Sequence, residues 1–131
     1  NEPMWPGCLS AHDPESLAWY EKRQMPLFSW SSQASGFLSG RYGPENAADA
    51  GMSDIARVWF SDENFERLNR VRELAKKKGV GPTQIALAWV LHQPFPTFPL
   101  VGAMTIEETR TAMLGLDVEL TPDEMRWLDL A

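Results

Sequence analysis

The segment from Pro82 to Leu91 constrains the fold most, because a helix built from it has almost no polar face. Every residue from Ile85 to Leu91 is apolar, and Pro94 stops the run shortly afterwards. A helix that is apolar on all sides must be buried between layers of other structure. The apolar run is also far too short to cross a bilayer, which needs ~20 residues. The sequence therefore predicts a layered globular fold with this helix near its centre.

Two short apolar runs, Met25 to Trp30 and Thr97 to Val101, are the predicted strands. Helical patterns precede and follow each run, and the expected order is helix, strand, loop, helix, helix, strand, helix, helix. Alternating strands and helices favour right-handed crossovers and a parallel sheet whose strands are buried on both faces. Two strands are too few for such a sheet. We therefore expect the sheet to be completed by a second copy of the chain or by strands of a longer protein.

Capping residues predict where the helices begin and end. The predicted N-caps are Asp13, Ser61, Thr105 and Thr121, and the predicted C-cap is Gly79. Between the first two helices, residues 40–60 contain glycine and proline with no sustained apolar period. Residues 40–60 are therefore predicted to form a long loop of the kind that usually carries function.

The charge balance excludes one class of partner. The chain carries 12 Lys and Arg against 18 Asp and Glu, a formal net charge of −6. Without a basic stripe, such a surface repels a phosphate backbone, so no nucleic-acid partner is predicted. The composition, 44% hydrophobic and 23% charged, is that of an ordinary globular protein, and the length suits one domain over residues 1–131.

The cysteine and histidine content indicates the cellular compartment and whether a metal site is expected. Cys8 is the single cysteine and cannot form an internal disulfide, and no signal-peptide pattern opens the sequence. We therefore expect a cytoplasmic protein with no membrane partner. His12 and His92 lack metal-ligand spacing, so no metal site is predicted. No Ser/His/Asp order, phosphate-binding P-loop or zinc motif is present.

Small polar residues follow both predicted strands. Ser31 to Gly36 follows the first, and Val101 to Thr105 follows the second and leads into a helix. Backbone N–H groups, hydroxyls and a helix N-terminus at the carboxyl ends of adjacent parallel strands suit a phosphate. On spacing alone, an ordinary strand-to-helix connection is favoured for each. Trp30, at the end of the first strand, suits either core filling or a flat surface for an aromatic ligand.

Four stretches together resemble the C-terminal part of an aldo-keto reductase. They occur in that family's order and spacing, and the resemblance runs from about Trp19 to the end of the chain. The stretches are residues 25–42 (MPLFSWSSQASGFLSGRY), 75–91 (AKKKGVGPTQIALAWVL), 99–103 (PLVGA) and 117–121 (DVELT).

The resemblance implies an α/β fold, the C-terminal half of a (β/α)8 TIM barrel. Such a barrel needs ~250 residues, so residues 1–131 are expected to supply its last two strands with flanking helices. It also implies a nicotinamide cofactor, NADP or NAD, with Trp30 stacked on the nicotinamide and the pyrophosphate held under the loop of residues 40–60. The residues expected at the pyrophosphate are Ser31, Ser32, Gln33, Ser35, Gly36 and Arg41, and those expected at the adenosine end are Gly102, Met104, Glu108, Thr111 and Ala112.

The sequence departs from the family at the adenosine end. A carboxylate at Glu108, where the family has polar or basic residues, disfavours a 2′-phosphate by like-charge repulsion, so we expect a protein that tolerates NAD. The family's catalytic Tyr, Asp, Lys and His have no counterpart here, since Tyr20 and Tyr42 are not at the catalytic position, and no catalytic residue is predicted in this chain.

Two functions are expected to compete. One is the cofactor-binding half of an NAD(P)H-dependent oxidoreductase that reduces aldehydes or ketones to alcohols and needs an N-terminal half-barrel. The alternative is a non-catalytic half-barrel that self-associates as a nucleotide-binding or interaction module.

Overall fold

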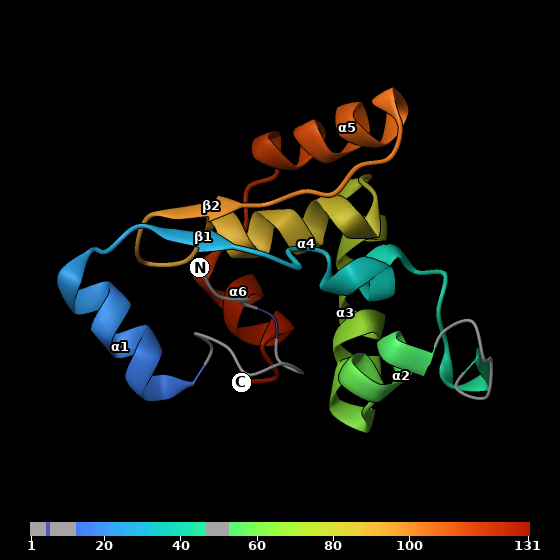
Figure 1. Ribbon diagram of the computed structural model, residues 1–131, viewed down its shortest axis with the longest axis horizontal. Helices are drawn as coiled ribbons and strands as arrows, with labels where there is room; N and C mark the ends of the chain where they lie inside the picture. The colour runs from blue at the N-terminus through green and yellow to red at the C-terminus, as the bar shows by residue number, and fades with distance from the viewer. Residues whose placement is uncertain (1–4, 6–12, 47–52) are drawn as a thin grey trace.

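A computed structural model describes Trp5, residues 13–46 and residues 53–131 of the chain. Six α-helices, two strands and several 3-10 helices, labelled η, follow one another in the described residues (Figure 1). Their bounds are α1 Pro14–Arg23, β1 Leu27–Ser29, η1 Ala34–Ser39, η2 Pro44–Asn46, α2 Ser53–Trp59, α3 Asp62–Lys78, α4 Pro82–Leu91, β2 Thr97–Pro99, α5 Ile106–Met113, η4 Leu114–Asp117 and α6 Pro122–Leu128.

The capping predictions are confirmed at every helix they concern. Asp13 accepts a hydrogen bond from the Ser16 N–H at 3.0 Å, and Gly79 ends α3 in the left-handed region at φ 70°. The hydroxyls of the remaining N-caps each accept from the backbone N–H three residues along, at 3.1–3.2 Å. These N-caps are Ser61, Thr105 and Thr121. Each bond satisfies a backbone donor that the helix itself leaves unpaired.

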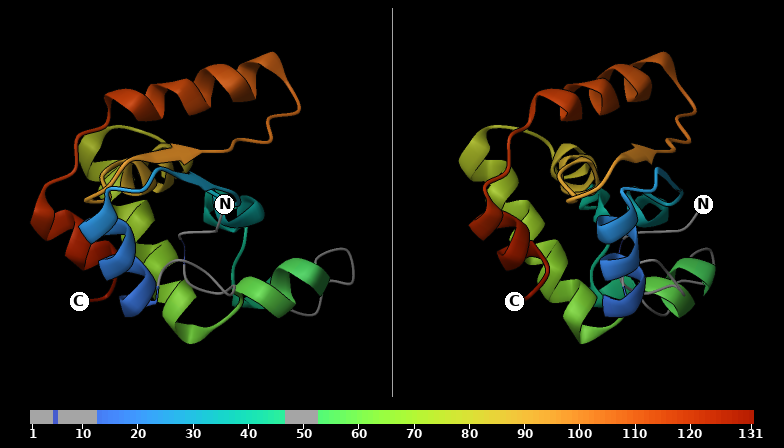
Figure 2. Two further views of the ribbon diagram at one scale, coloured as in Figure 1. Left: turned by 60° about the vertical axis from the view of Figure 1, so that its left-hand side comes forward. Right: turned by 90° about the vertical axis from the view of Figure 1, so that its left-hand side faces the viewer.

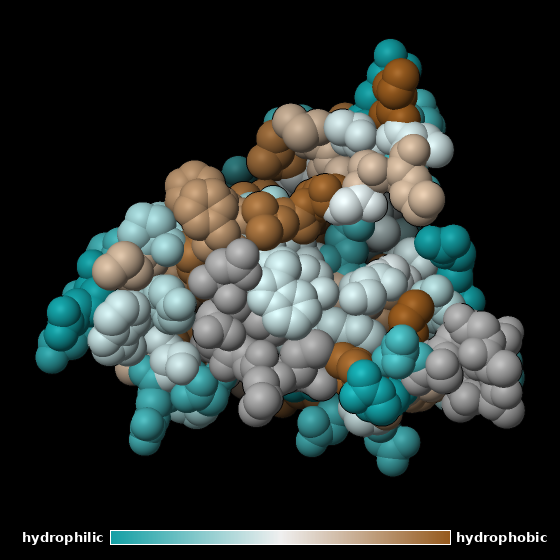
Figure 3. Space-filling view, in the orientation of Figure 1, coloured by the Kyte–Doolittle hydropathy of each residue, from teal (hydrophilic) through white to brown (hydrophobic). Residues whose placement is uncertain are grey.

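The two strands form a parallel pair in which Phe28 lies opposite Phe98. Helix α4 covers one face of this pair, where Leu27 and Ser29 are buried. The other face is open, with Phe28 and Phe98 52% and 49% exposed and their rings stacked at 5.1 Å. Apolar side chains therefore gather over β1 and β2 in the space-filling view (Figure 3). The expectation that these strands are buried on both faces is wrong for the described residues, because nothing in them covers the second face.

Helix α4 lies at the centre of the molecule, as its lack of a polar face predicts. Every residue from Gln84 to Val90 is buried, and α4 contacts α3, η1, β2, α5 and η4. Gly115 of η4 permits one of these contacts, because a β-carbon there would lie 3.2 Å from the Leu87 Cβ and 3.4 Å from the Gln84 carbonyl oxygen. The close approach fixes where the chain after α5 returns to the core.

Helix α5 extends from the body of the molecule (Figure 2). Residues 100–110 are all exposed, whereas Ala112 is buried. The C-terminal part of α5 thus contacts α4 and η4. The N-terminal turn of α5 is exposed and lies beyond the ends of the strands.

The prediction of a loop over residues 40–60 is wrong for Ser53–Trp59, which form helix α2. The cause is a short apolar period, since Ile55, Val58 and Trp59 pack against the core three and four residues apart. The start of the segment is held by the Arg72 guanidinium of α3, which donates to the carbonyls of Gly40 and Tyr42 at 2.8 and 3.0 Å.

Candidate functional site

A cavity of about 580 Å³ lies where the two strands end and where α4 and α5 begin. Because β1 and β2 are parallel, their carboxyl ends meet at one edge of the sheet, and both helices direct their N-termini toward that edge (Figure 1). The cavity lies between η1 and the exposed N-terminal turn of α5, where the surface in Figure 3 is hollowed. Helix N-termini carry partial positive charge, so the position favours an anion.

One wall is the turn from Ser31 to Gly36. Ser31, Ala34 and Ser35 have φ of 50°, 51° and 53°, and Gly36 has φ 88°. The left-handed region is uncommon for residues other than glycine, and such conformations persist only where the surroundings hold them. The turn is closed by the Ala34 N–H on the Ser31 carbonyl at 2.7 Å and the Gly36 N–H on the Gln33 carbonyl at 3.1 Å.

Arg41 supplies the cation of this wall. Its Nε donates to the Ser39 hydroxyl at 3.2 Å, and its guanidinium lies near Gly36, where an added β-carbon would be 3.9 Å from Nη2. The side chain is exposed and lines the cavity. A planar guanidinium beside a turn of hydroxyls suits a phosphate group.

The opposite wall is acidic. Glu107 and Glu108, in the first turn of α5, both line the cavity. The Glu108 carboxylate accepts a hydrogen bond from the Met104 N–H at 2.7 Å, and this bond holds the carboxylate at the N-terminus of α5. Cation and carboxylates thus face the same cavity from different elements, with Arg41 on one side and the two glutamates on the other.

The structure brings together the predicted cofactor residues except Trp30. The residues that line the cavity as predicted are Ser31, Ser32, Gln33, Ser35, Gly36, Arg41, Gly102, Met104, Glu108, Thr111 and Ala112. Trp30 comes directly after β1, is 39% exposed and does not line the cavity. The role of all twelve in cofactor binding stays a prediction.

Ser32 differs from its neighbours in the turn. Its side chain is buried, and its hydroxyl donates to the Ser29 carbonyl at 2.8 Å. The Ser29 carbonyl also accepts from the Leu100 N–H at 2.8 Å, so this oxygen joins the turn to both strands. Ser32 therefore shapes the turn through its hydroxyl rather than presenting that hydroxyl to a ligand.

Six lining residues were not predicted: Ser39, Thr83, Leu100, Val101, Ala103 and Glu107. Thr83 is in the first turn of α4, and it could have been found from the topology, because a helix that runs antiparallel to its strands begins at their carboxyl end. Among the described residues of 40–60, only Arg41 lines the cavity, so the expected cover over the pyrophosphate is not seen in that part of the segment.

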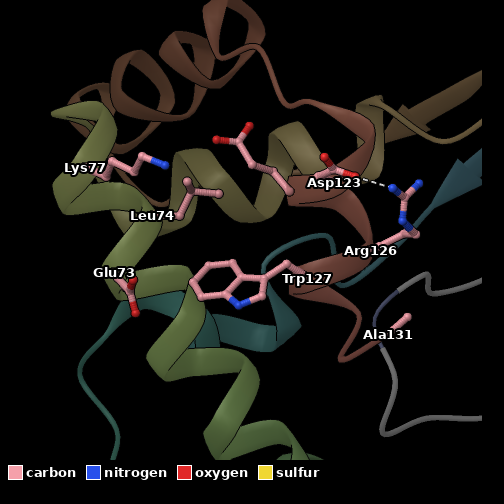
Figure 4. Close-up of a pocket in the computed structure, with 8 residues that line it drawn as sticks. Glu73, Leu74, Lys77, Asp123, Arg126, Trp127 and Ala131 are labelled. Carbon is pink, nitrogen blue, oxygen red and sulfur yellow. Dashed lines mark hydrogen bonds and ion pairs between the residues drawn. The ribbon is translucent and has the colours of Figure 1, made fainter.

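A second cavity of about 520 Å³ lies between α3 and α6, on another part of the molecule (Figure 4). Most of its charges are neutralised, since Arg126 pairs with Asp123 and Glu124 pairs with Lys78. Figure 4 shows Trp127 and Leu74 as its apolar side. Without a set of converging unpaired donors or acceptors, this cavity does not compete with the first.

The histidines, cysteine and tyrosines supply no further site in the described residues. Cys8 and His12 lie outside them. His92 is held by structural bonds, with Nδ1 2.7 Å from the Ala88 carbonyl and Nε2 accepting from the Leu120 N–H at 3.3 Å. Tyr20 stacks on Phe95, and Tyr42 packs edge-on to Phe60, so neither reaches the cavity.

The part of the chain that the structure describes contains neither a cluster of metal ligands nor a membrane-spanning helix. No three His, Cys, Asp or Glu side chains come together there as a metal-binding group. No helix in that part has the length and apolar character to span a bilayer.

Comparison with known proteins decides the family. The profile of the aldo/keto reductase family matches residues 7–131. The chain belongs to the aldo/keto reductase family. Versiconal hemiacetal acetate reductase of Aspergillus parasiticus is 35% identical over 107 residues, which cover 79% of this chain and 31% of that protein. An uncharacterized oxidoreductase of Bacillus subtilis is 30% identical over 103 residues, with coverage of 79% and 31%.

This aldo/keto reductase chain thus spans about a third of the length of the curated relatives it matches. Members of the family form a (β/α)8 barrel and generally use NAD(P)H, and the cavity lies where such barrels bind ligands, at the carboxyl ends of the strands. A two-stranded parallel sheet with one open face agrees with part of a barrel.

Proposed function

We propose that this chain is the cofactor-binding part of an NAD(P)H-dependent oxidoreductase that reduces aldehydes or ketones to alcohols. The observation that carries the proposal is the cavity at the strand ends, which is lined by eleven of the twelve residues predicted from the sequence. Membership of the aldo/keto reductase family supports the reaction class. The chain's place as the last two strands of the barrel, and the cytoplasm as its location, belong to the same proposal.

The residues at the cavity fit a dinucleotide. Hydroxyls of Ser31 and Ser35 and the Arg41 guanidinium would hold the pyrophosphate, aided by the N-termini of α4 and α5. Glu107 and Glu108 suit ribose hydroxyls, which can donate to carboxylates. Trp30 would offer its exposed ring to the nicotinamide.

When bound, the nicotinamide supplies the hydride that reduces the carbonyl carbon. The chain's own residues would bind the cofactor and orient it. None of the described tyrosines lines the cavity as a proton donor. The acid that protonates the carbonyl oxygen is therefore expected to come from residues outside this chain segment.

The test is titration of the complete polypeptide that carries these residues with NADH and NADPH, followed by assays with simple aldehydes and ketones. Binding of either dinucleotide that Arg41→Ala weakens by about tenfold, together with carbonyl reduction, is expected. Failure to bind either dinucleotide would overturn the proposal. Binding without reduction of any carbonyl would favour the second candidate below.

The open face of the sheet favours a second candidate, a non-catalytic half-barrel that binds nucleotides or associates with itself. Phe28 and Phe98 are half exposed there, and exposed apolar faces mark interfaces. The two candidates differ in the intact mass of the natural protein. A mass near the 14.8 kDa of this chain supports the half-barrel, and a much larger mass supports the oxidoreductase.

A further inference from the structure

Trp5 connects a distant segment to the wall of the cavity. Its side chain is 2% exposed, and its indole Nε1–H donates to the Ser32 carbonyl at 3.0 Å across 27 residues of sequence. Its ring stacks on Trp89 of α4, with centroids 4.2 Å apart and planes 26° apart. Trp5 is thus fixed on the central helix and reaches the turn from there.

The bonded residue lies within the strained part of the turn. Ser31 and Ala34, on either side of Ser32 and Gln33, both have positive φ without being glycine. The hydroxyl of Ser32 is already committed to Ser29, so its carbonyl is the second point at which the turn is held. Among the hydrogen bonds of the described residues, the bond from Trp5 is the one that ties Ser31–Gly36 to a remote segment.

A remote anchor of this kind affects ligand binding. A turn with several left-handed residues relaxes when its supports are removed, and the cavity-lining side chains of Ser31 and Ser35 then lose the positions that a phosphate would need. Holding the turn in place before the ligand arrives reduces the ordering required on binding.

We propose that Trp5 is a positioning residue, whose indole N–H holds the Ser31–Gly36 turn in the form that receives the dinucleotide phosphates. The binding part of this inference rests on the proposed function. The proposal assigns no chemistry to Trp5, which acts through the Ser32 carbonyl and does not line the cavity.

The test compares Trp5→Phe with Trp89→Phe in the complete polypeptide. Both variants keep an aromatic pair at the stack, but only Trp5→Phe removes the donor to Ser32, whereas the Trp89 indole donates to the Met125 carbonyl in α6. We expect Trp5→Phe to weaken NADH binding by about fivefold and to speed hydrogen exchange of the amides in residues 31–36. Trp89→Phe should leave both near the wild-type values.

A benzothienylalanine at position 5 repeats the test without shrinking the ring, because sulfur replaces only the N–H. This variant covers the case in which Trp5→Phe fails to fold. Wild-type exchange in the turn with either replacement at position 5, or an equal effect of Trp89→Phe, would overturn the proposal. If the wild-type protein binds no dinucleotide, the proposed function fails, whereas the exchange comparison still decides the role of Trp5.

Discussion

Glu108 sets the electrostatic character of the cavity at the mouth of α5. Its carboxylate is held there by the Met104 N–H at 2.7 Å, and Glu107 lines the same wall. Two carboxylates repel a 2′-phosphate and can accept hydrogen bonds from a free ribose diol. The expected tolerance of NAD thus depends on these two carboxylates, and Glu108 is the one whose replacement tests it.

Replacing Glu108 by Arg should shift the ratio of the NADPH and NADH dissociation constants by about tenfold toward NADPH, because a fixed negative charge becomes positive beside the ribose. Glu108→Gln should give part of this shift. Fluorescence titration of the complete polypeptide measures both constants. Glu73→Arg on α3 makes the same charge change away from the cavity and should leave the ratio alone. Tighter or equal binding of NADPH by the wild-type protein would contradict the prediction.

Gly115 is the residue whose lack of a side chain the packing requires. A β-carbon there would lie 3.2 Å from the Leu87 Cβ, so Gly115→Ala should lower the free energy of unfolding by about 1–3 kcal/mol through overpacking against α4. Urea unfolding measures the change. The control is Gly102→Ala, where an added β-carbon meets nothing within 4 Å. Equal stability of the two variants would show that η4 can move away from α4 without loss.

At the scale of elements, helix ends were predictable and strand ends were not. Caps are local, so Asp13 and Thr121 could be assigned from a few neighbouring residues. Strand length depends on partners, and β1 and β2 are three residues each because each pairs on one edge only in the described residues. Helix α2 was missed because its apolar period is only two turns long and follows glycine and proline.

The start of α6 gives the molecule a pH-dependent element. Glu124 accepts from the Thr121 N–H at 2.9 Å and pairs with Lys78 of α3 at 3.0 Å. Burial alone would raise the pKa of the Glu124 carboxyl, but the Thr121 N–H and the Lys78 ammonium together outweigh it, so the pKa is lowered below its ordinary value. The carboxylate therefore contributes stability that is present above about pH 4.3 and is lost as the pH falls through the folded-state pKa.

Glu124→Gln should remove this dependence while keeping the cap, because glutamine also completes a capping box. We expect the variant to be less stable than wild type by about 0.5–1 kcal/mol at pH 7, and the difference to shrink as the pH falls below about 4.3. Urea unfolding across that pH range gives both values. The control is Glu21→Gln, which is the same substitution at an exposed position on α1. A difference in the free energy of unfolding between wild type and Glu124→Gln that stays the same at every pH would contradict the prediction.

At the scale of the whole molecule, the position of the cavity was predictable because parallel strands bring their carboxyl ends together. That single topological fact explains why Ser31–Gly36 and Gly102 meet although some seventy residues separate them in sequence. The anchor at Trp5 could not be predicted in this way. Its bond to Ser32 depends on the stack with Trp89, and no period or motif links three residues so placed.

The open face of the sheet leads to the last prediction. Phe28 and Phe98 are half exposed, and the outer edges of β1 and β2 are unpaired in the described residues, a combination that promotes association. Residues 1–131 produced alone should therefore associate, and Phe28→Ser with Phe98→Ser should shift them toward monomer in size-exclusion chromatography with light scattering. The matched control is Met113→Ser in α5 with Leu116→Ser in η4, which removes two apolar side chains that are each 56% exposed.

The complete polypeptide should respond in the opposite way, because further barrel strands would cover the same two rings. There the Phe28→Ser and Phe98→Ser pair should lower stability by about 3 kcal/mol or more, as expected for the loss of buried aromatic side chains. The Met113→Ser and Leu116→Ser pair should lower it little. Two results together would contradict the prediction: residues 1–131 form a stable monomer, and the Phe28→Ser and Phe98→Ser pair leaves the stability of the complete polypeptide unchanged. They would mean that this face of the sheet is exposed in the complete polypeptide and that no barrel strands cover it.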